Sequence, residues 1–178
     1  GTLVSTDLLF ESLVALARTN VWALLLVPFW LTRGVTHLKS ELARRTRLDP
    51  SLLPYRQEVL DWLVRERSAE RRLLLVTGSH EQLARAVADH VQLFDEVVAT
   101  TDELNLVREA KRDALNARLG EGRYDYAGDA QADLPVWAAA RQAVVVAAKA
   151  PVEQAARSRG NVVRSFPRAG ARLATFAR

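Results

Sequence analysis

A strand that runs into a helix through two carboxylates is the feature that most constrains this chain. Residues 124–137 read YDYAGDAQADLPVW, which predicts a short strand, a turn at Gly128 and a helix opening near Asp133. In an open α/β sheet, ligands bind where strands end and helices begin. Asp129 and Asp133 repel one another unless a cation lies nearby, and Mg²⁺ is the simplest cation for oxygen ligands. The alternative is that Asp129 forms an Asx-turn and Asp133 only caps the helix.

Composition and charge exclude several classes of protein. The chain has 178 residues, 49% of them apolar and 26% charged, which suits one soluble domain, with or without an insert. It has no cysteine, so a disulfide framework, a thiolate metal site and a cysteine nucleophile are excluded. The net charge of +4 lies in the C-terminal part, because six arginines and one acid follow residue 150. No aromatic residues alternate with basic ones, so we expect no nucleic-acid partner.

Short apolar runs alternate with helical patterns over the C-terminal two thirds of the chain. The runs predict strands at residues 72–77, 94–100, 124–127, 142–148 and 162–166. Helices are predicted among them at residues 107–119, 133–141 and 151–159. This alternation predicts an α/β fold, with a parallel sheet that is covered by helices.

The N-terminal part is predicted to be helical and contains eleven apolar residues in a row, 21–31. This run is too short to span a bilayer, which needs about 20 residues, and Pro28 interrupts it. It forms either a buried helix pair or a surface that touches lipid, an apolar substrate or a partner domain. Trp22, Phe29 and Trp30 suit the interfacial reading. A linker and an amphipathic helix, residues 44–66, follow this part.

Two further places carry candidate chemistry. Thr77 ends a predicted strand with Gly78 behind it, and their hydroxyl and amides suit phosphate oxygens; helix capping, which we assign to Ser79 and Gln82, is the alternative. Lys111 lies on the apolar face of its predicted helix, where a lysine snorkels or meets an acid. A small site of anion binder, cation and metal ligand follows from these residues and Asp129.

The same residues resemble the motifs of the haloacid dehalogenase (HAD) superfamily of phosphatases. The second motif of that family, an apolar strand ending in Thr, is similar to residues 73–77, and the helical lysine of the third is similar to Lys111. The fourth, Gly-Asp-x-x-x-Asp, is similar to residues 128–133. The first, Asp-x-Asp-Gly-Thr-Leu/Val, matches Gly-Thr-Leu-Val at residues 1–4, with both acids missing.

This resemblance implies a fold and a domain organisation. It implies a HAD-like Rossmannoid α/β/α fold in three layers, with a parallel sheet and a helical cap inserted after the first motif. Residues 1–7 would be the remnant of the first motif, 8–66 the cap and 67–166 the core. Residues 167–178 would be a basic tail or linker. The cap of such proteins shields the site from water and selects the substrate.

The resemblance also implies a reaction, Mg²⁺-dependent phosphoryl hydrolysis through an aspartyl-phosphate. By carry-over, Asp129 binds Mg²⁺, and Asp133 supports it or orients Lys111. Thr77, Gly78 and Lys111 bind the phosphoryl group, and Thr77, Lys111 and Asp133 are the catalytic candidates. The substrate would be a phosphorylated small molecule or a polyprenyl phosphate. The nucleophile and the general acid/base would be the two missing acids, so we expect them upstream of this chain, and the fragment alone to be inactive.

The wording of the fourth-motif region resembles a narrower group, in which a HAD domain precedes a membrane-embedded UbiA-type polyprenyltransferase. The chain's end, residues 172–178, is similar to the approach to that membrane domain, and cytoplasmic flanks of membrane helices are rich in Arg. The expected location is therefore the cytoplasm, with its membrane face as a second choice. The alternative function is a non-catalytic HAD-like module that docks on, or regulates, a membrane prenyltransferase. A dehalogenase or phosphotransferase on the same scaffold is a third reading.

Overall fold

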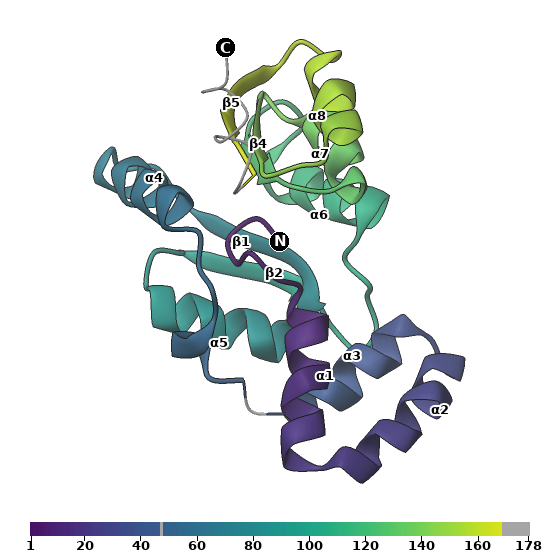
Figure 1. The fold of residues 1–178 in the computed structure, drawn as a ribbon. Helices are drawn as coiled ribbons and strands as arrows, with labels where there is room; N and C mark the ends of the chain where they lie inside the picture. Colours follow the sequence, from purple (N-terminus) through teal and green to yellow (C-terminus); the bar gives the residue numbers. More distant parts are fainter. Residues whose placement is uncertain (47, 169–178) are drawn as a thin grey trace, which may run out of the picture. The chain divides into compact units, whose positions relative to one another are not determined.

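A computed structural model describes residues 1–46 and 48–168 of the chain (Figure 1). The chain divides into two compact units, and each is described here by itself. One unit is Val4–Leu106, and the other joins Gly1–Leu3 to Val107–Arg178. The predicted basic tail falls largely on residues 169–178, which lie outside the described residues, as does the segment that resembles the approach to a membrane domain.

The sheet of the Val4–Leu106 unit has two parallel strands, β1 (Leu74–His80) and β2 (Glu96–Thr100). Helix α5 (Glu81–Val91) packs against both of them. The register runs evenly until Thr77 pairs with Ala99, and it then shifts so that His80 pairs with Thr100. The prediction that the strand ends at Thr77 is therefore wrong. The strand continues through an irregularity, because Gly78 and small residues tolerate a bulge that bends it.

The N-terminus of α5 also differs from the prediction of a capping box between Ser79 and Gln82. The N-cap residue is His80, whose ring Nδ1 accepts a hydrogen bond from the Gln82 backbone N–H at 3.4 Å. An imidazole nitrogen therefore takes the role that a serine hydroxyl usually fills. The cap by His80 could not be predicted from the sequence, because histidine is not among the preferred capping residues.

The helical part of this unit has four pieces, α1 (Leu8–Thr19), η1 (Val21–Leu26), α2 (Val27–Thr32) and α3 (Val35–Arg45). Asn20 ends α1, and its side chain caps η1. Pro28 lies in the first turn of α2, where its missing N–H costs no hydrogen bond. The pieces enclose a small core, made of Leu16, Ala23, Trp30, Leu38 and Leu42.

The apolar run at residues 21–31 is divided between this core and the surface. Trp30 is buried at 4% exposure, whereas Trp22 is 77% and Phe29 is 54% exposed. The interfacial reading of Trp30 is thus wrong, since its ring packs inside. Among the described residues, no helix is both long and apolar enough to cross a membrane.

The rest of this unit links the helices to the sheet. A short 3₁₀ turn, η2 (Pro50–Leu52), follows α3, and α4 (Gln57–Ser68) then leads to β1. An isolated antiparallel bridge pairs Val4 with Tyr55, so the first residues of the unit lie beside the start of α4. Arg67, near the end of α4, forms an ion pair with Asp95, which precedes β2.

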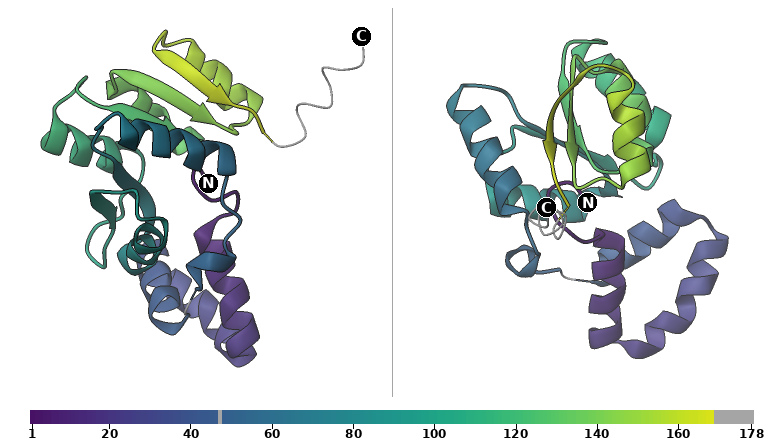
Figure 2. Two further views of the ribbon diagram at one scale, coloured as in Figure 1. Left: turned by 90° about the vertical axis from the view of Figure 1, so that its left-hand side faces the viewer. Right: turned by 45° about the horizontal axis from the view of Figure 1, so that its top comes forward.

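The other unit holds a parallel three-stranded sheet in the order β3-β4-β5 (Figure 2). Its strands are β3 (Asp125–Gly128), β4 (Gln142–Val146) and β5 (Val162–Phe166). Its helices are α6 (Arg108–Leu119), η3 (Gln131–Asp133), α7 (Leu134–Ala139) and α8 (Ala150–Arg157). The central strand β4 is buried from Ala143 to Val146, as expected for an apolar run between two parallel neighbours.

All strand pairs are parallel, as predicted, but they form two sheets. Strand β1 pairs only with β2, and β3 pairs only with β4, so each of them leaves one edge open within the described residues. No strand of the described chain joins the two sheets. The fold class of alternating parallel strands and helices is nevertheless confirmed.

Candidate functional site

Lys111 is the centre of a buried polar network in the unit that contains β3. It lies on α6 and is 8% exposed, and its Nζ donates to Asp133 Oδ1 and to the Tyr126 hydroxyl, both at 3.0 Å. The Tyr126 hydroxyl in turn donates to Asp133 Oδ1 at 2.9 Å. The prediction that this lysine meets an acid is confirmed. A paired ammonium with two fixed partners has a defined position, which a snorkelling lysine lacks.

Asp133 fixes the turn after β3 as well as the lysine. Its Oδ2 accepts hydrogen bonds from the backbone N–H groups of Asp129 at 3.0 Å and Ala130 at 3.1 Å. Both carboxylate oxygens are therefore occupied, one by side chains and one by the turn. The geometry matches an orienting role for Asp133 and leaves it poorly suited to ligating a metal directly.

Gly128 allows this close approach of turn and carboxylate. A Cβ built on it would lie 2.8 Å from the Cβ and Cγ of Asp133, which is closer than carbon atoms pack. Glycine is thus required at the end of β3 because a side chain there would collide with Asp133, and not because of its backbone angles. The Gly-Asp-x-x-x-Asp spacing has a direct physical meaning here, because Gly128 makes room for the acid five residues later.

The part that Tyr126 plays in this network was not predicted from the sequence. Burial and the neighbouring charge of Asp133 raise the pKa of Tyr126 well above its ordinary value, so the phenol keeps its proton and remains a donor. Two features point to it, since Tyr126 is a buried strand residue between half-buried neighbours and a buried tyrosine needs a hydrogen-bond partner.

Asp129 is the more accessible of the two acids, with its side chain 27% exposed. Its Oδ1 accepts a hydrogen bond from the Thr2 hydroxyl at 2.7 Å, and its Oδ2 lies 3.5 Å from the N-terminal ammonium of Gly1. Thr2 and Gly1 belong to the segment that resembles the first motif, and the structure brings them to Asp129 in the segment that resembles the fourth.

Asp129 suits a Mg²⁺ ion that is held by one carboxylate together with waters and substrate oxygens, and not one that is enclosed by several protein ligands. The described residues contain no group of three or more His, Cys, Asp or Glu side chains that could hold a metal. Mg²⁺ is usually held by one or two carboxylates, waters and substrate phosphate oxygens. Asp129 supplies one such carboxylate, and Asp133 would steady it through the backbone of the turn.

Thr77 and Gly78 lie in the Val4–Leu106 unit. The Thr77 hydroxyl accepts a hydrogen bond from the Ser79 N–H at 3.1 Å, so it already shapes the irregular end of β1. The Gly78 carbonyl accepts from Lys39 Nζ at 2.5 Å and from the Thr100 hydroxyl at 2.9 Å. The main chain here is held firmly, and the Thr77 hydroxyl proton stays available for a further acceptor.

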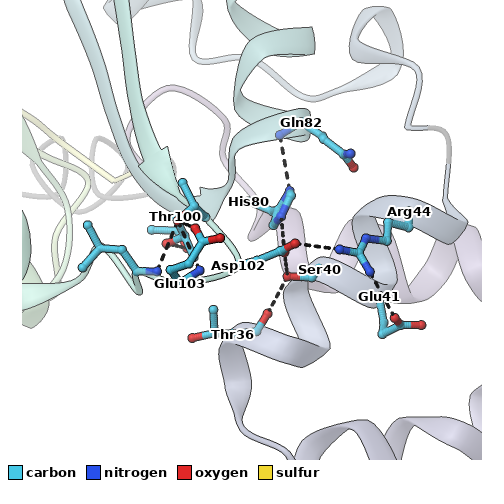
Figure 3. Close-up of polar contacts among 12 residues, drawn as sticks. Thr36, Ser40, Glu41, Arg44, His80, Gln82, Thr100, Asp102 and Glu103 are labelled. Atoms are coloured by element: carbon cyan, nitrogen blue, oxygen red, sulfur yellow. Dashed lines mark hydrogen bonds and ion pairs between the residues drawn. The ribbon is translucent and has the colours of Figure 1, made fainter.

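A second polar cluster, unforeseen from the sequence, lies just beyond this segment (Figure 3). Asp102 Oδ1 accepts from the Ser40 hydroxyl at 2.5 Å and lies 3.2 Å from His80 Nε2, and Asp102 Oδ2 lies 2.6 Å from Arg44. Because His80 Nδ1 accepts from Gln82, the proton belongs on Nε2, facing Asp102.

This cluster ties helix α3 to the ends of β1 and β2. Hydrogen bonds from Ser40 and then His80, together with the charge of Arg44, lower the pKa of Asp102, so its carboxylate is favoured. Serine, histidine and aspartate are all present, but Ser40 bonds to Asp102 and not to His80. The cluster therefore lacks the base–nucleophile contact of a hydrolase triad, and a structural role fits it.

Comparison with known proteins gives one sequence relative and several similar folds. No family model matches the chain. The uncharacterized protein y4nM of Sinorhizobium fredii (strain NBRC 101917 / NGR234) is 37% identical over 167 residues, which are 93% of this chain. The chain spans only 32% of the length of that relative.

Three solved structures show the fold. A protein of unknown function from Bordetella pertussis Tohama I has a TM-score of 0.71 at 15% identity, with 93% of each chain covered. A HAD family hydrolase from Salmonella enterica subsp. enterica serovar Typhi has a TM-score of 0.64 at 15% identity, covering 96% of this chain and 66% of that one. A phosphoserine phosphatase in apo form has a TM-score of 0.65 at 14% identity, with 98% and 92% covered. The chain thus has a HAD-like Rossmannoid fold, as expected.

Proposed function

We propose that this chain is part of a Mg²⁺-dependent phosphoryl hydrolase of the HAD type. The observation that carries the proposal is the buried Lys111–Tyr126–Asp133 network beside the accessible Asp129. A fixed ammonium and an accessible carboxylate next to one strand end are what an anionic substrate and its counter-cation require. The HAD-like fold supports the same assignment.

In the proposed reaction, an aspartate upstream of Gly1 attacks phosphorus, the leaving alcohol departs, and water then hydrolyses the aspartyl-phosphate. Lys111 offsets the negative charge on the phosphoryl oxygens, and Asp133 with Tyr126 holds its ammonium in place. Asp129 would hold Mg²⁺, which supplies charge neutralisation when bound.

Each of the two sheets has an open edge among the described residues. β1 and β3 are each parallel to their one neighbour and lack a partner on the other side within the described residues. Each of these edges could pair with a further strand. The substrate we propose is a phosphorylated small molecule or a polyprenyl phosphate, met in the cytoplasm or at its membrane face.

The test is hydrolysis of p-nitrophenyl phosphate by a chain that carries its upstream residues, with and without Mg²⁺. We expect Mg²⁺-dependent turnover that falls by about 100-fold or more in Asp129→Asn, the size of effect seen when one charge-stabilising group is lost. Asp113→Asn is the matched control, because Asp113 is an exposed acid of the same unit.

Three outcomes separate the readings. Turnover that is independent of Mg²⁺ would favour the dehalogenase or another activity on this scaffold. An upstream sequence without Asp-x-Asp, with no turnover in a folded protein, would favour the non-catalytic module that docks on a membrane prenyltransferase. Equal turnover in Asp129→Asn and Asp113→Asn would overturn the role of Asp129.

A further inference from the structure

An exposed apolar surface covers η1, α2 and the adjoining residues of the helical part. Its most exposed members are Val21, Trp22, Leu25, Phe29 and Leu31, with exposed fractions between 51% and 77%. Soluble proteins rarely leave so many large apolar side chains together without a binding partner. We call this set the apolar arm; it lies at the end of the helical part that is remote from β1 and β2 (Figure 1).

The exposure follows from the order of the residues and is not caused by a loose fold. Along η1 and into α2, Trp22, Leu25 and Phe29 recur every three or four residues, which places them on one side. Ala23 and Trp30 recur on the opposite side and are buried in the core of the helical part. Each piece thus has an apolar face turned inward and a second one turned to solvent.

The stretch of sequence that contains the apolar arm carries charges of one sign only. The sequence from residue 12 to residue 40 contains no aspartate or glutamate, but it contains Arg18, Arg33 and Lys39. Arg18 and Arg33 are exposed, one on each side of the arm. The Arg33 guanidinium carbon lies 4.8 Å from the centre of the Phe29 ring, so this positive charge borders the apolar arm directly.

We propose that the apolar arm docks on the surface of an anionic lipid bilayer. Aromatic and aliphatic side chains of an interfacial helix enter the boundary between headgroups and acyl chains, and arginines beside them attract anionic headgroups. The arm meets both requirements, with Trp22 and Phe29 at its exposed face and Arg18 and Arg33 at its borders.

The charge pattern favours lipid over a second copy of the chain. An isologous dimer through the arm would bring Arg33 of one copy and Arg18 or Arg33 of the other into one apolar interface, and residues 12–40 supply no acid to pair with them. Unpaired like charges oppose such an interface. A surface rich in lipid phosphates supplies the missing negative charge.

The experiment is co-sedimentation of the 178-residue chain with large vesicles of phosphatidylglycerol and phosphatidylcholine in equal parts. Vesicles of phosphatidylcholine alone are the comparison. We expect binding to the mixed vesicles, weaker binding at high salt, and a blue shift of tryptophan emission that is lost in Trp22→Phe. The double variant Trp22→Ser with Leu25→Ser should lose at least about tenfold in apparent affinity.

Matched controls are available because other large apolar side chains are exposed elsewhere. Leu52→Ser in η2 and Val163→Ser in β5 remove side chains that are 80% and 57% exposed, and they should leave vesicle binding unchanged. Arg18→Gln with Arg33→Gln should weaken binding to the anionic vesicles while it leaves the fold intact, as checked by circular dichroism.

Two results would overturn the proposal. Binding that persists in the folded Trp22→Ser, Leu25→Ser variant would show that another segment, such as the arginine-rich C-terminal part, binds the vesicles. An absence of binding, with a sedimentation equilibrium that shows a dimer abolished by the same variant, would instead make the apolar arm a self-association surface.

Discussion

The two polar clusters of this protein link helices to strand ends in different ways. In the unit with β3, Lys111 and Asp133 are buried, with side-chain exposures of 10% and 6%. In the Val4–Leu106 unit, Asp102 and Arg44 have side-chain exposures of 47% and 54%, although His80 and Ser40 beside them are buried. One cluster has removed its charges from water, and the other keeps its charges in contact with it.

This difference predicts how each cluster responds to substitution. A buried charge that loses its partner keeps the full cost of its desolvation, whereas an exposed one is solvated again. Burial also fixes the position of a charge, which a catalytic group needs. We therefore propose a chemical role for the Lys111 cluster and a structural role for the Asp102 cluster.

The largest expected effect is that of Lys111→Met. Removing the ammonium leaves Asp133 buried without a counter-charge, so we expect a loss of about 3–5 kcal/mol in the free energy of unfolding. Urea denaturation monitored by circular dichroism measures it. Arg112→Met on the same helix removes a cation whose partner Asp113 is exposed, and it should cost far less. Equal losses in the two variants would contradict the distinction between buried and exposed clusters.

The next effect is that of Gly128→Ala. The added methyl meets Asp133, which four hydrogen bonds hold in place, so we expect a loss of about 1–3 kcal/mol. The same substitution made in an Asp133→Gly background should cost clearly less, because the opposing side chain is gone, including its Cβ. A cost that is independent of residue 133 would show that the strain arises elsewhere.

A smaller effect is expected in the second cluster for Ser40→Ala. Its hydroxyl bonds to Asp102 and to the Thr36 carbonyl, and losing it should lower the melting temperature by about 2–5 °C. Arg44→Met removes only a solvated partner of Asp102 and should shift the melting temperature by less than about 2 °C. A shift for Arg44→Met as large as that for Lys111→Met would break the comparison.

The smallest expected effect is on the stability of the fold at low pH. The pKa of Asp102 is lowered in the folded chain by Ser40 and His80, so the ionised carboxylate stabilises the fold above the unfolded pKa of about 3.9. That stability is lost as the pH falls through the lower folded pKa. Asp102→Asn should flatten the fall of stability between about pH 4 and pH 2. Asp95→Asn should do the same, since Arg67 lowers the pKa of Asp95; unchanged profiles in both would refute this.

Much of the fold could be predicted because strand periodicity and helix punctuation are local signals. The last strand matches its predicted bounds, residues 162–166, and Lys111 was recognised from its place on an apolar helix face. The 3₁₀ segment η1 was not foreseen, since an unbroken apolar run carries no period from which to choose a helix type.

The parts of the site that could not be predicted depend on contacts distant in sequence. Tyr126 is 15 residues from Lys111, and Asp102 is 62 residues from Ser40, so no local spacing records either pair. Helix capping by His80 was missed for a different reason, because the choice between Ser79 and His80 depends on where the irregular end of β1 stops. The types of residue in the candidate site could be predicted from the sequence, but tertiary packing determines which of them contact one another.

The most direct test of the proposed role of Lys111 compares the catalytic activity of two variants in α6. p-Nitrophenyl phosphate hydrolysis would be measured with Mg²⁺ in chains that carry the upstream residues, at a temperature where circular dichroism shows each variant folded. The account predicts that Lys111→Met lowers kcat/KM by about 100-fold or more, while Arg112→Met stays within about twofold of the parent. Mg²⁺-dependent hydrolysis that survives in folded Lys111→Met would contradict it.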